Sequence, residues 1–219
     1  GDAITTGTRN IAVGYNALTS DTLGSKSVAV GLGTLGDQNF TTATDALNTA
    51  VGHGAGSSVS TGIQNTIVGA LAGDALTDAD FNVAIGIQAL SGDTLGSGTT
   101  AVGTATLSSQ NFTTATISYN TALGYYAGAS VTTGVQNTLL GGLAGDALTD
   151  ADVNVAVGYG ALSSAVTDGA NTAVGAQALL NANTGTATLS YNTAVGYNAG
   201  VAVTTGINNT IVGGLAGSV

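Results

Sequence analysis

The sequence predicts an all-β protein that folds as a parallel β-solenoid of twelve coils. A five-residue pattern, Asn-Thr-Ala-Val-Gly at residues 171–175, recurs with small variations in eleven other places. The copies follow one another in steps of 17 or 21 residues, as from Asn10 to Ser27 and from Ser27 to Asn48. Such regular spacing along a whole chain is typical of repeat architectures. The 35 glycines and the many Thr, Ser and Asn residues oppose helix throughout.

The steps between copies group the coils into larger blocks. The copies begin at Asn10, Ser27, Asn48, Asn65, Asn82, Thr99, Asn120, Asn137, Asn154, Asn171, Asn192 and Asn209. One longer step therefore follows every three shorter ones, and four steps make one superrepeat. The chain divides into blocks 1–72, 73–144 and 145–216, and residues 217–219 begin a fourth. We expect a single solenoid over residues 1–219, since the blocks follow one another without a linker.

Each copy predicts a short strand followed by a corner. The second and fourth residues are branched and fall on one face of a strand, while the third, Ala in nine copies, falls on the other. The fifth residue is always glycine, which can adopt positive φ or admit a second backbone, and so predicts a corner. The corner glycines are Gly14, Gly31, Gly52, Gly69, Gly86, Gly103, Gly124, Gly141, Gly158, Gly175, Gly196 and Gly213.

The remainder of each coil is predicted to hold a second short strand and a loop. One coil of a parallel β-solenoid consists of a strand, a corner, another strand and a loop, and the distance between successive copies is long enough for one such coil. The first residue of the copy is Asn in ten of the twelve cases. These asparagines either stack as a ladder along the coils or occupy the left-handed region that Asn tolerates.

The longer coils, one in each block, predict three enlarged loops, at residues 36–47, 108–119 and 180–191. Insertions in a solenoid map to loops on one side, often the binding side. The residues that we predict to face a receptor are Gln38, Asn39, Thr42 and Thr44, then Gln110, Asn111, Thr114 and Thr116, and finally Asn183, Thr186 and Thr188.

Composition excludes several classes of partner. The net charge of −10, with only Arg9 and Lys26 basic, argues against nucleic acid and against an anionic membrane surface. No run of about 18 apolar residues is present, so no insertion of this segment into a membrane is predicted. Without Cys there are no disulfides or thiolate metal sites. The sequence begins without Met and shows no signal peptide, so we expect a segment of a longer polypeptide.

The repeat resembles two known families. Ser27-Val28-Ala29-Val30-Gly31 in particular is similar to the Ser-Val-Ala-Ile-Gly repeat in the heads of trimeric autotransporter adhesins of the Yersinia adhesin type. It is also similar to repeats of bacteriophage tail fibres that precede an intramolecular chaperone. The resemblance implies a left-handed β-roll, three chains side by side as a homotrimer, and an extracellular, cell-surface or virion-tail location.

In a trimer, the third residue of each copy is expected to lie at the interface between chains. This residue is Ile67, Leu139 or Ile211 in the fourth copy of each block, where the other copies have Ala. We expect these larger side chains to pack against neighbouring chains and set their register.

Aspartates on one recurring loop raise the possibility of calcium. Gly-Asp-Ala-Leu-Thr-Asp-Ala-Asp occurs twice, and its candidate ligands are Asp74, Asp78 and Asp80 with Asp146, Asp150 and Asp152. Calcium takes six to eight oxygen ligands, and the spacing fits neither an EF-hand nor a nonapeptide calcium repeat. Solvated turn residues that keep the protein soluble are therefore the favoured interpretation, and no cofactor is expected.

The residue after the corner glycine is aromatic in several coils. Tyr15, Tyr125, Tyr159 and Tyr197 share this position with His53. These tyrosines either seal the seam between chains or form an exposed stripe for sugar rings.

No enzyme is predicted. Residues 31–36 match Gly-x-Gly-x-x-Gly, but no helix is predicted to follow as a dinucleotide site requires. A lone histidine, with no nucleophile or cofactor motif, gives no catalytic set.

The favoured function is a structural or adhesive module of a phage tail fibre or surface adhesin, serving as a rigid spacer and binding a host receptor or glycan. The alternatives are a segment of an extracellular filament or matrix protein and an ice- or calcium-binding solenoid. The Thr-x-Thr pairs of the enlarged loops return only every fourth coil, about 19 Å apart, which is too sparse to match an ice lattice.

Overall fold

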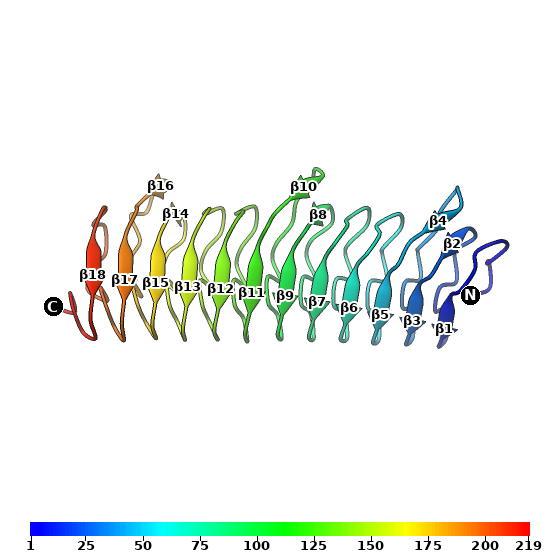
Figure 1. Cartoon of the computed structure of the whole chain (residues 1–219), viewed down its shortest axis with the longest axis horizontal. Coiled ribbons are helices and arrows are strands. Elements are labelled where there is room, and N and C mark those ends of the chain that lie inside the picture. The colour runs from blue at the N-terminus through cyan, green and yellow to red at the C-terminus, as the bar shows by residue number, and fades with distance from the viewer. The chain divides into compact units, whose positions relative to one another are not determined.

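The computed structural model describes all 219 residues and shows an all-β parallel β-solenoid of twelve coils with no helix (Figure 1). The chain divides into two compact units. The first comprises Gly1–Ala105 with Asn111–Ile117, and the second comprises Thr106–Gln110 with Ser118–Val219. Each unit contains one three-residue strand from each of six coils.

The strands of the first unit lie side by side in chain order. They are β1 (Ile11–Val13), β3 (Val28–Val30), β5 (Thr49–Val51), β6 (Thr66–Val68), β7 (Val83–Ile85) and β9 (Thr100–Val102). Equivalent positions of successive copies are paired in parallel, as Ile11 with Val28 and Ala50 with Ile67. A slip of one residue would exchange the faces of a strand, so this register keeps every third-position residue on one side.

The second unit has the same arrangement. Its strands are β11 (Thr121–Leu123), β12 (Thr138–Leu140), β13 (Val155–Val157), β15 (Thr172–Val174), β17 (Thr193–Val195) and β18 (Thr210–Val212). Their pairing again joins equivalent positions, as Ala122 with Leu139. The predicted strands are thus confirmed, and so is their register within each unit.

A second strand does not follow every corner, so that part of the prediction is wrong. Two-residue strands occur in three pairs that precede the main strands: β2 (Gly24–Ser25) with β4 (Thr44–Asp45), β8 (Gly96–Ser97) with β10 (Thr116–Ile117), and β14 (Asp168–Gly169) with β16 (Thr188–Leu189). After a corner the chain turns again at once, because two residues adopt positive φ, as Asn16 (57°) and Leu18 (51°) do. No extended run can form there.

The core is thin and lies inside the coils. Third-position residues such as Ala29 and Ala50 are fully buried, together with leucines such as Leu18 and Leu35. Those leucines have φ of 51° and 49°, which costs an L-residue about 1–2 kcal/mol. Burying a leucine side chain contributes about 1.5–3 kcal/mol, which offsets that strain.

The larger third-position residues also face this core. Ile67 and Leu139 are fully buried by their own chain, and Ile211 is half-buried on the same face. The prediction that these residues pack against neighbouring chains is therefore wrong.

Glycines make room for these larger residues. A Cβ placed on Gly56 would lie 2.8 Å from Ile67 Cδ1, and one on Gly145 would lie 2.8 Å from Leu139 Cδ2. The sequence has leucine at the equivalent positions of the other two coils of each block. The block of four coils is thus the unit in which large and small core side chains alternate.

Asparagines form a ladder along each unit. The Asn82 backbone N–H donates to Asn65 Oδ1 at 2.9 Å, and Asn65 N–H donates to Asn48 Oδ1 at the same distance. Asn65 Nδ2 in turn donates to the Ala79 carbonyl at 2.7 Å. The ladder prediction is confirmed. The left-handed residue is the one before the first residue of each copy, as Gln64 (φ 58°) before Asn65.

The corner glycines are confirmed as corners. All twelve have φ between 127° and 141°, a region that side-chain-bearing residues avoid. A Cβ placed on Gly69 would lie 2.5 Å from the carbonyl oxygen of Gly86 in the next coil. The corner therefore requires glycine both for its dihedral angle and for the approach of the neighbouring backbone.

Gly69→Ala tests this double requirement. Backbone strain of this kind costs about 1–3 kcal/mol, and the contact with Gly86 adds to it. The matched control is Gly33→Ala, where φ is 67° but the added Cβ meets nothing within 4 Å. We expect Gly69→Ala to lower the free energy of unfolding well below that of the control in urea denaturation followed by circular dichroism. Equal losses would contradict the close-approach argument.

Candidate functional site

The first candidate surface is the outward side of the main strands, which we call the outer sheet face. The fourth residue of every copy lies on it and is always Val, Ile or Leu. These residues are Val13, Val30, Val51, Val68, Ile85 and Val102 in the first unit, and Leu123, Leu140, Val157, Val174, Val195 and Val212 in the second. All are exposed or half-buried in the single chain. Each unit thus carries an unbroken outward row of branched aliphatic side chains.

Exposed aromatic and aliphatic residues flank this face. Tyr15, Tyr125, Tyr159 and Tyr197, which follow corner glycines, are all more than half exposed, and His53 is exposed as well. Large residues also precede several strands, among them Phe81, Tyr119 and Tyr191, and these too are more than half exposed. The apolar surface therefore extends past both ends of the strands.

The enlarged loops form the second candidate surface. In the first unit the chain leading into β4 and β10 extends past the neighbouring loops on one side, and in the second unit the chain leading into β16 does the same (Figure 1). Asn39, Thr42, Asn111, Thr114 and Thr186 are exposed, and Thr44, Thr116, Asn183 and Thr188 are partly exposed. These nine predicted residues can reach a partner.

Gln38 and Gln110 are fully buried, so they do not face a receptor as predicted. Gln38 Nε2 donates to Asp21 Oδ2 at 2.6 Å, and its Oε1 accepts from Asn48 Nδ2 at 2.9 Å. Gln110 Oε1 likewise accepts from Asn120 Nδ2 at 2.8 Å. These amides connect the enlarged loops to the asparagine ladder.

The buried carboxylates of Asp21 and Asp93 anchor the enlarged loops, and this role was not predicted from the sequence. Asp21 Oδ1 accepts from Gly24 N–H at 2.9 Å, and Asp93 Oδ1 accepts from Phe112 N–H at 3.0 Å. The recurrence of Asp at this position in blocks one and two was the available signal.

The third block anchors its loop with a different aspartate. Ala165 stands where the other blocks have Asp21 and Asp93, and Asp168 stands where they have glycine. Asp168 Oδ2 accepts from Thr184 N–H at 2.8 Å, and its Oδ1 accepts from the Ser190 hydroxyl at 3.2 Å. One buried carboxylate is thus present beneath the third loop as well.

The six candidate calcium ligands are exposed or partly exposed. No three carboxylates or histidines of the chain lie close enough together to hold a metal ion. Several of the aspartates instead bond to the preceding coil. Asp80 Oδ1 accepts from Ile63 N–H and Asp152 Oδ1 from Val135 N–H, both at 2.8 Å, while Asp78 accepts from the Thr61 hydroxyl at 2.7 Å. The Asp150 carboxylate accepts from the adjacent Thr149 hydroxyl.

Asp74 and Asp146 differ from the other four. Each has a buried Oδ1 with no hydrogen-bond partner. Burial raises the pKa of both carboxyls above the ordinary value of 3.8, because it disfavours the charged form.

The glycine motif at residues 31–36 forms one corner and the turn after it, and no helix follows. Gly31 has φ 140° and packs against the Gly52 backbone. The arrangement lacks the helix N-terminus that would receive a pyrophosphate.

No family model, no curated protein and no solved structure matches this chain. The resemblance to adhesin-head and tail-fibre repeats therefore depends on the repeat residues alone. The chain has no helix of the length and apolar character needed to span a membrane.

Asp21→Ala tests the loop anchor. The change removes two hydrogen bonds to a charged group, each contributing about 1.5–3 kcal/mol, so we expect a loss of about 3 kcal/mol or more. Hydrogen exchange at residues 36–47 should accelerate together with the loss of stability. Asp37→Ala, an exposed aspartate of the same loop, is the control and should change neither. Unchanged exchange in Asp21→Ala would contradict the anchoring role.

Asp74→Asn tests the buried, unpartnered oxygen. Because the folded-state pKa is raised, the ionised carboxylate opposes folding at neutral pH, and this penalty disappears as pH falls through that pKa. The neutral variant should therefore have a higher melting temperature at neutral pH, with a gain that shrinks on acidification. Asp78→Asn, at an exposed carboxylate, should show no such gain in the same calorimetric scans. A gain that grows on acidification would contradict the burial argument.

Proposed function

We propose that this chain is a non-enzymatic segment of a trimeric attachment fibre, either a phage tail fibre or a cell-surface adhesin. In this role it acts as a rigid spacer and presents its enlarged loops to a host surface. The left-handed β-roll, the homotrimer and the location outside the cell or on a virion tail all come from the resemblance of the repeat.

The outer sheet face is the observation that carries this proposal. An exposed row of Val, Ile and Leu continues through every coil of each unit, and contiguous apolar surface of this kind marks an interaction site. The second-position residues beside it are Ile, Val and Thr, so the strands present no charge on this face. With the third-position residues already buried inside the coils, this face is the surface available to other chains.

A second copy of the chain suits this face better than an irregular partner. Branched side chains recur once per coil, at the strand spacing of about 4.8 Å. A surface with the same period can interdigitate with this row along its length, and another copy supplies that period. The tyrosines at the strand ends would then seal the seam, since aromatic residues are enriched at interfaces.

The enlarged loops support the attachment role. Their exposed residues are mostly Thr and Asn, which offer hydroxyl and amide groups for hydrogen bonding without charge. Anchoring by Asp21, Asp93 and Asp168 holds the base of each loop, which reduces the entropy lost on binding.

Sedimentation of Val51→Asp tests the trimer. Val51 is 38% exposed in the single chain, so aspartate there leaves the coil intact but would place an uncompensated charge in the interface. We expect the wild type to sediment as a trimer and Val51→Asp as a folded monomer. Thr42→Asp, which adds the same charge to an exposed loop, should remain trimeric. A monomeric wild type, or a trimeric Val51→Asp, would overturn the proposal.

A further inference from the structure

A small pocket in the second unit is formed by the paired strands β14 and β16, by the third enlarged loop and by the preceding coil. It is lined by Asp152, Thr167, Gly169, Ala187, Thr188 and Leu189, and its volume is about 160 Å³. One water needs only about 10–15 Å³ of such space, and pockets for drug-sized ligands have about 300–1,000 Å³. The pocket is therefore suited to one small ligand.

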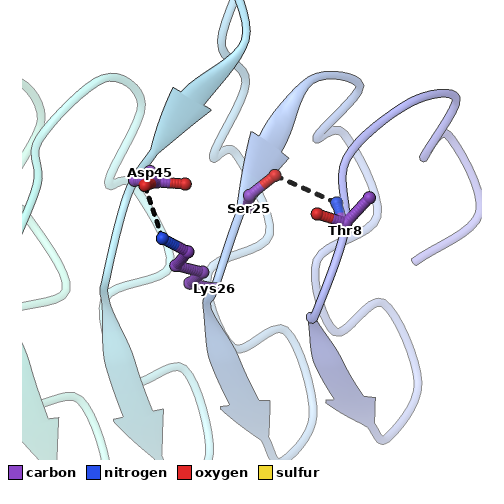
Figure 2. A network of polar contacts seen from close by, with 4 residues as sticks. All are labelled: Thr8, Ser25, Lys26 and Asp45. Atoms are coloured by element: carbon purple, nitrogen blue, oxygen red, sulfur yellow. Dashed lines mark hydrogen bonds and ion pairs between the residues drawn. The ribbon is translucent and has the colours of Figure 1, made fainter.

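The equivalent place in the other two blocks is filled by a serine. Ser25 Oγ accepts from Thr8 N–H at 3.0 Å, as Figure 2 shows, and Ser97 Oγ accepts from Asp80 N–H at 2.9 Å. In the first block an ion pair of 2.6 Å between Lys26 and Asp45 lies beside this contact (Figure 2). The serine hydroxyl thus satisfies a backbone donor of the preceding coil.

The third block lacks that serine. Its equivalent is Gly169. A Cβ placed there would lie 2.8 Å from the Asp152 carbonyl oxygen, 2.9 Å from Leu189 Cδ2 and 3.5 Å from the backbone nitrogen of Asp152. Asp152 is the equivalent of Thr8 and Asp80, and its N–H has no hydrogen bond within the chain. Ala170 and Leu189 replace the ion pair of the first block. The substitution therefore removes the serine hydroxyl and leaves the Asp152 N–H, a donor beside the pocket, without a partner in the chain.

Two further polar groups of the pocket are available. Thr167 stands where the other blocks have Leu23 and Leu95, and its hydroxyl oxygen is buried without a hydrogen-bond partner. The Asp152 carboxylate uses Oδ1 to accept from Val135 N–H, while Oδ2 carries no hydrogen bond within the chain. Of these groups the Thr167 hydroxyl is buried, and buried polar groups are rarely left unpaired in a folded protein. Together with the unpaired groups of Asp152 beside it, this hydroxyl indicates a ligand.

We propose that this pocket binds one sugar unit of a neutral glycan, with a ring hydroxyl in the place of the serine hydroxyl of the other blocks. That hydroxyl accepts from Asp152 N–H, and a neighbouring hydroxyl donates to the free carboxylate oxygen. Ala187 and Leu189 supply an apolar wall for the carbon side of the ring. The only basic residues, Arg9 and Lys26, lie in the first block, so nothing near the pocket would neutralise an anionic sugar. This inference rests on the proposed attachment function and names the ligand of its third loop.

Saturation-transfer NMR on the intact chain tests the proposal. The probes are free glucose, galactose and N-acetylglucosamine at millimolar concentration. We expect ring-proton signals from at least one of them. Thr167→Leu restores the residue of the other two blocks and fills the pocket, so it should abolish the signal while the melting temperature is kept. Gly169→Ser restores the serine hydroxyl and should also abolish the signal, but it should lower the melting temperature because its Cβ would lie 2.8 Å from the Asp152 carbonyl oxygen. Thr186→Ser, at an exposed position of the same loop, should retain it.

Three outcomes would overturn this assignment. They are no signal from any of the three sugars, a signal that survives both filling variants, and a crystal structure grown with the sugar in which only ordered water occupies the pocket. If one of these occurs while the wild type still sediments as a trimer, the sugar site fails and the fibre proposal stands. If the wild type is a monomer but binds the sugar, the fibre proposal fails and the sugar site stands.

Discussion

The backbone of each coil approaches the next coil as closely as hydrogen bonding between strands allows, and the rest of the structure depends on this spacing. It excludes any side chain at the corners, where a Cβ on Gly69 would meet the Gly86 carbonyl. It also makes the interior so thin that alanine fills most of it. Side chains that repeat once per coil, such as Asn48 and Asn65, come within reach of one another and form the buried ladder. One distance thus selects Gly, Ala and Asn at their positions.

The strands, the corners and the ladder could be predicted because each is a local requirement repeated twelve times. Alternation within residues 11–13 places Ala12 opposite Ile11 and Val13, and recurrence removes the ambiguity that a single short strand has. A glycine that never varies among twelve copies indicates a backbone constraint, as the positive φ of Gly14 shows. Asparagine at one position of successive coils similarly predicts stacking, since equivalent residues lie side by side in a solenoid.

Contacts between residues at different positions of neighbouring coils could not be predicted from the repeat. Alternation defines two faces of a strand without showing which one is covered, so Ile67 was expected on the outside. The available signal was the pair Gly56 and Gly73, whose missing side chains make room for it. Gln38 was expected to be exposed because it lies in a polar loop, but its partner Asp21 is on the preceding coil. The loop anchors and the pocket depend on such stacking, which appears only once the coils are in register.

The packing of Ile67 against Gly56 and Gly73 restricts which coils the gene can gain or lose. Removing the third coil of a block alone would take away Gly56, set Ile67 against Leu35 and overfill the interior. Removing or adding a whole block, such as 73–144, preserves every large and small neighbour pair. We therefore expect the third and fourth coils of a block to be gained or lost together, as they are when whole blocks are duplicated or deleted.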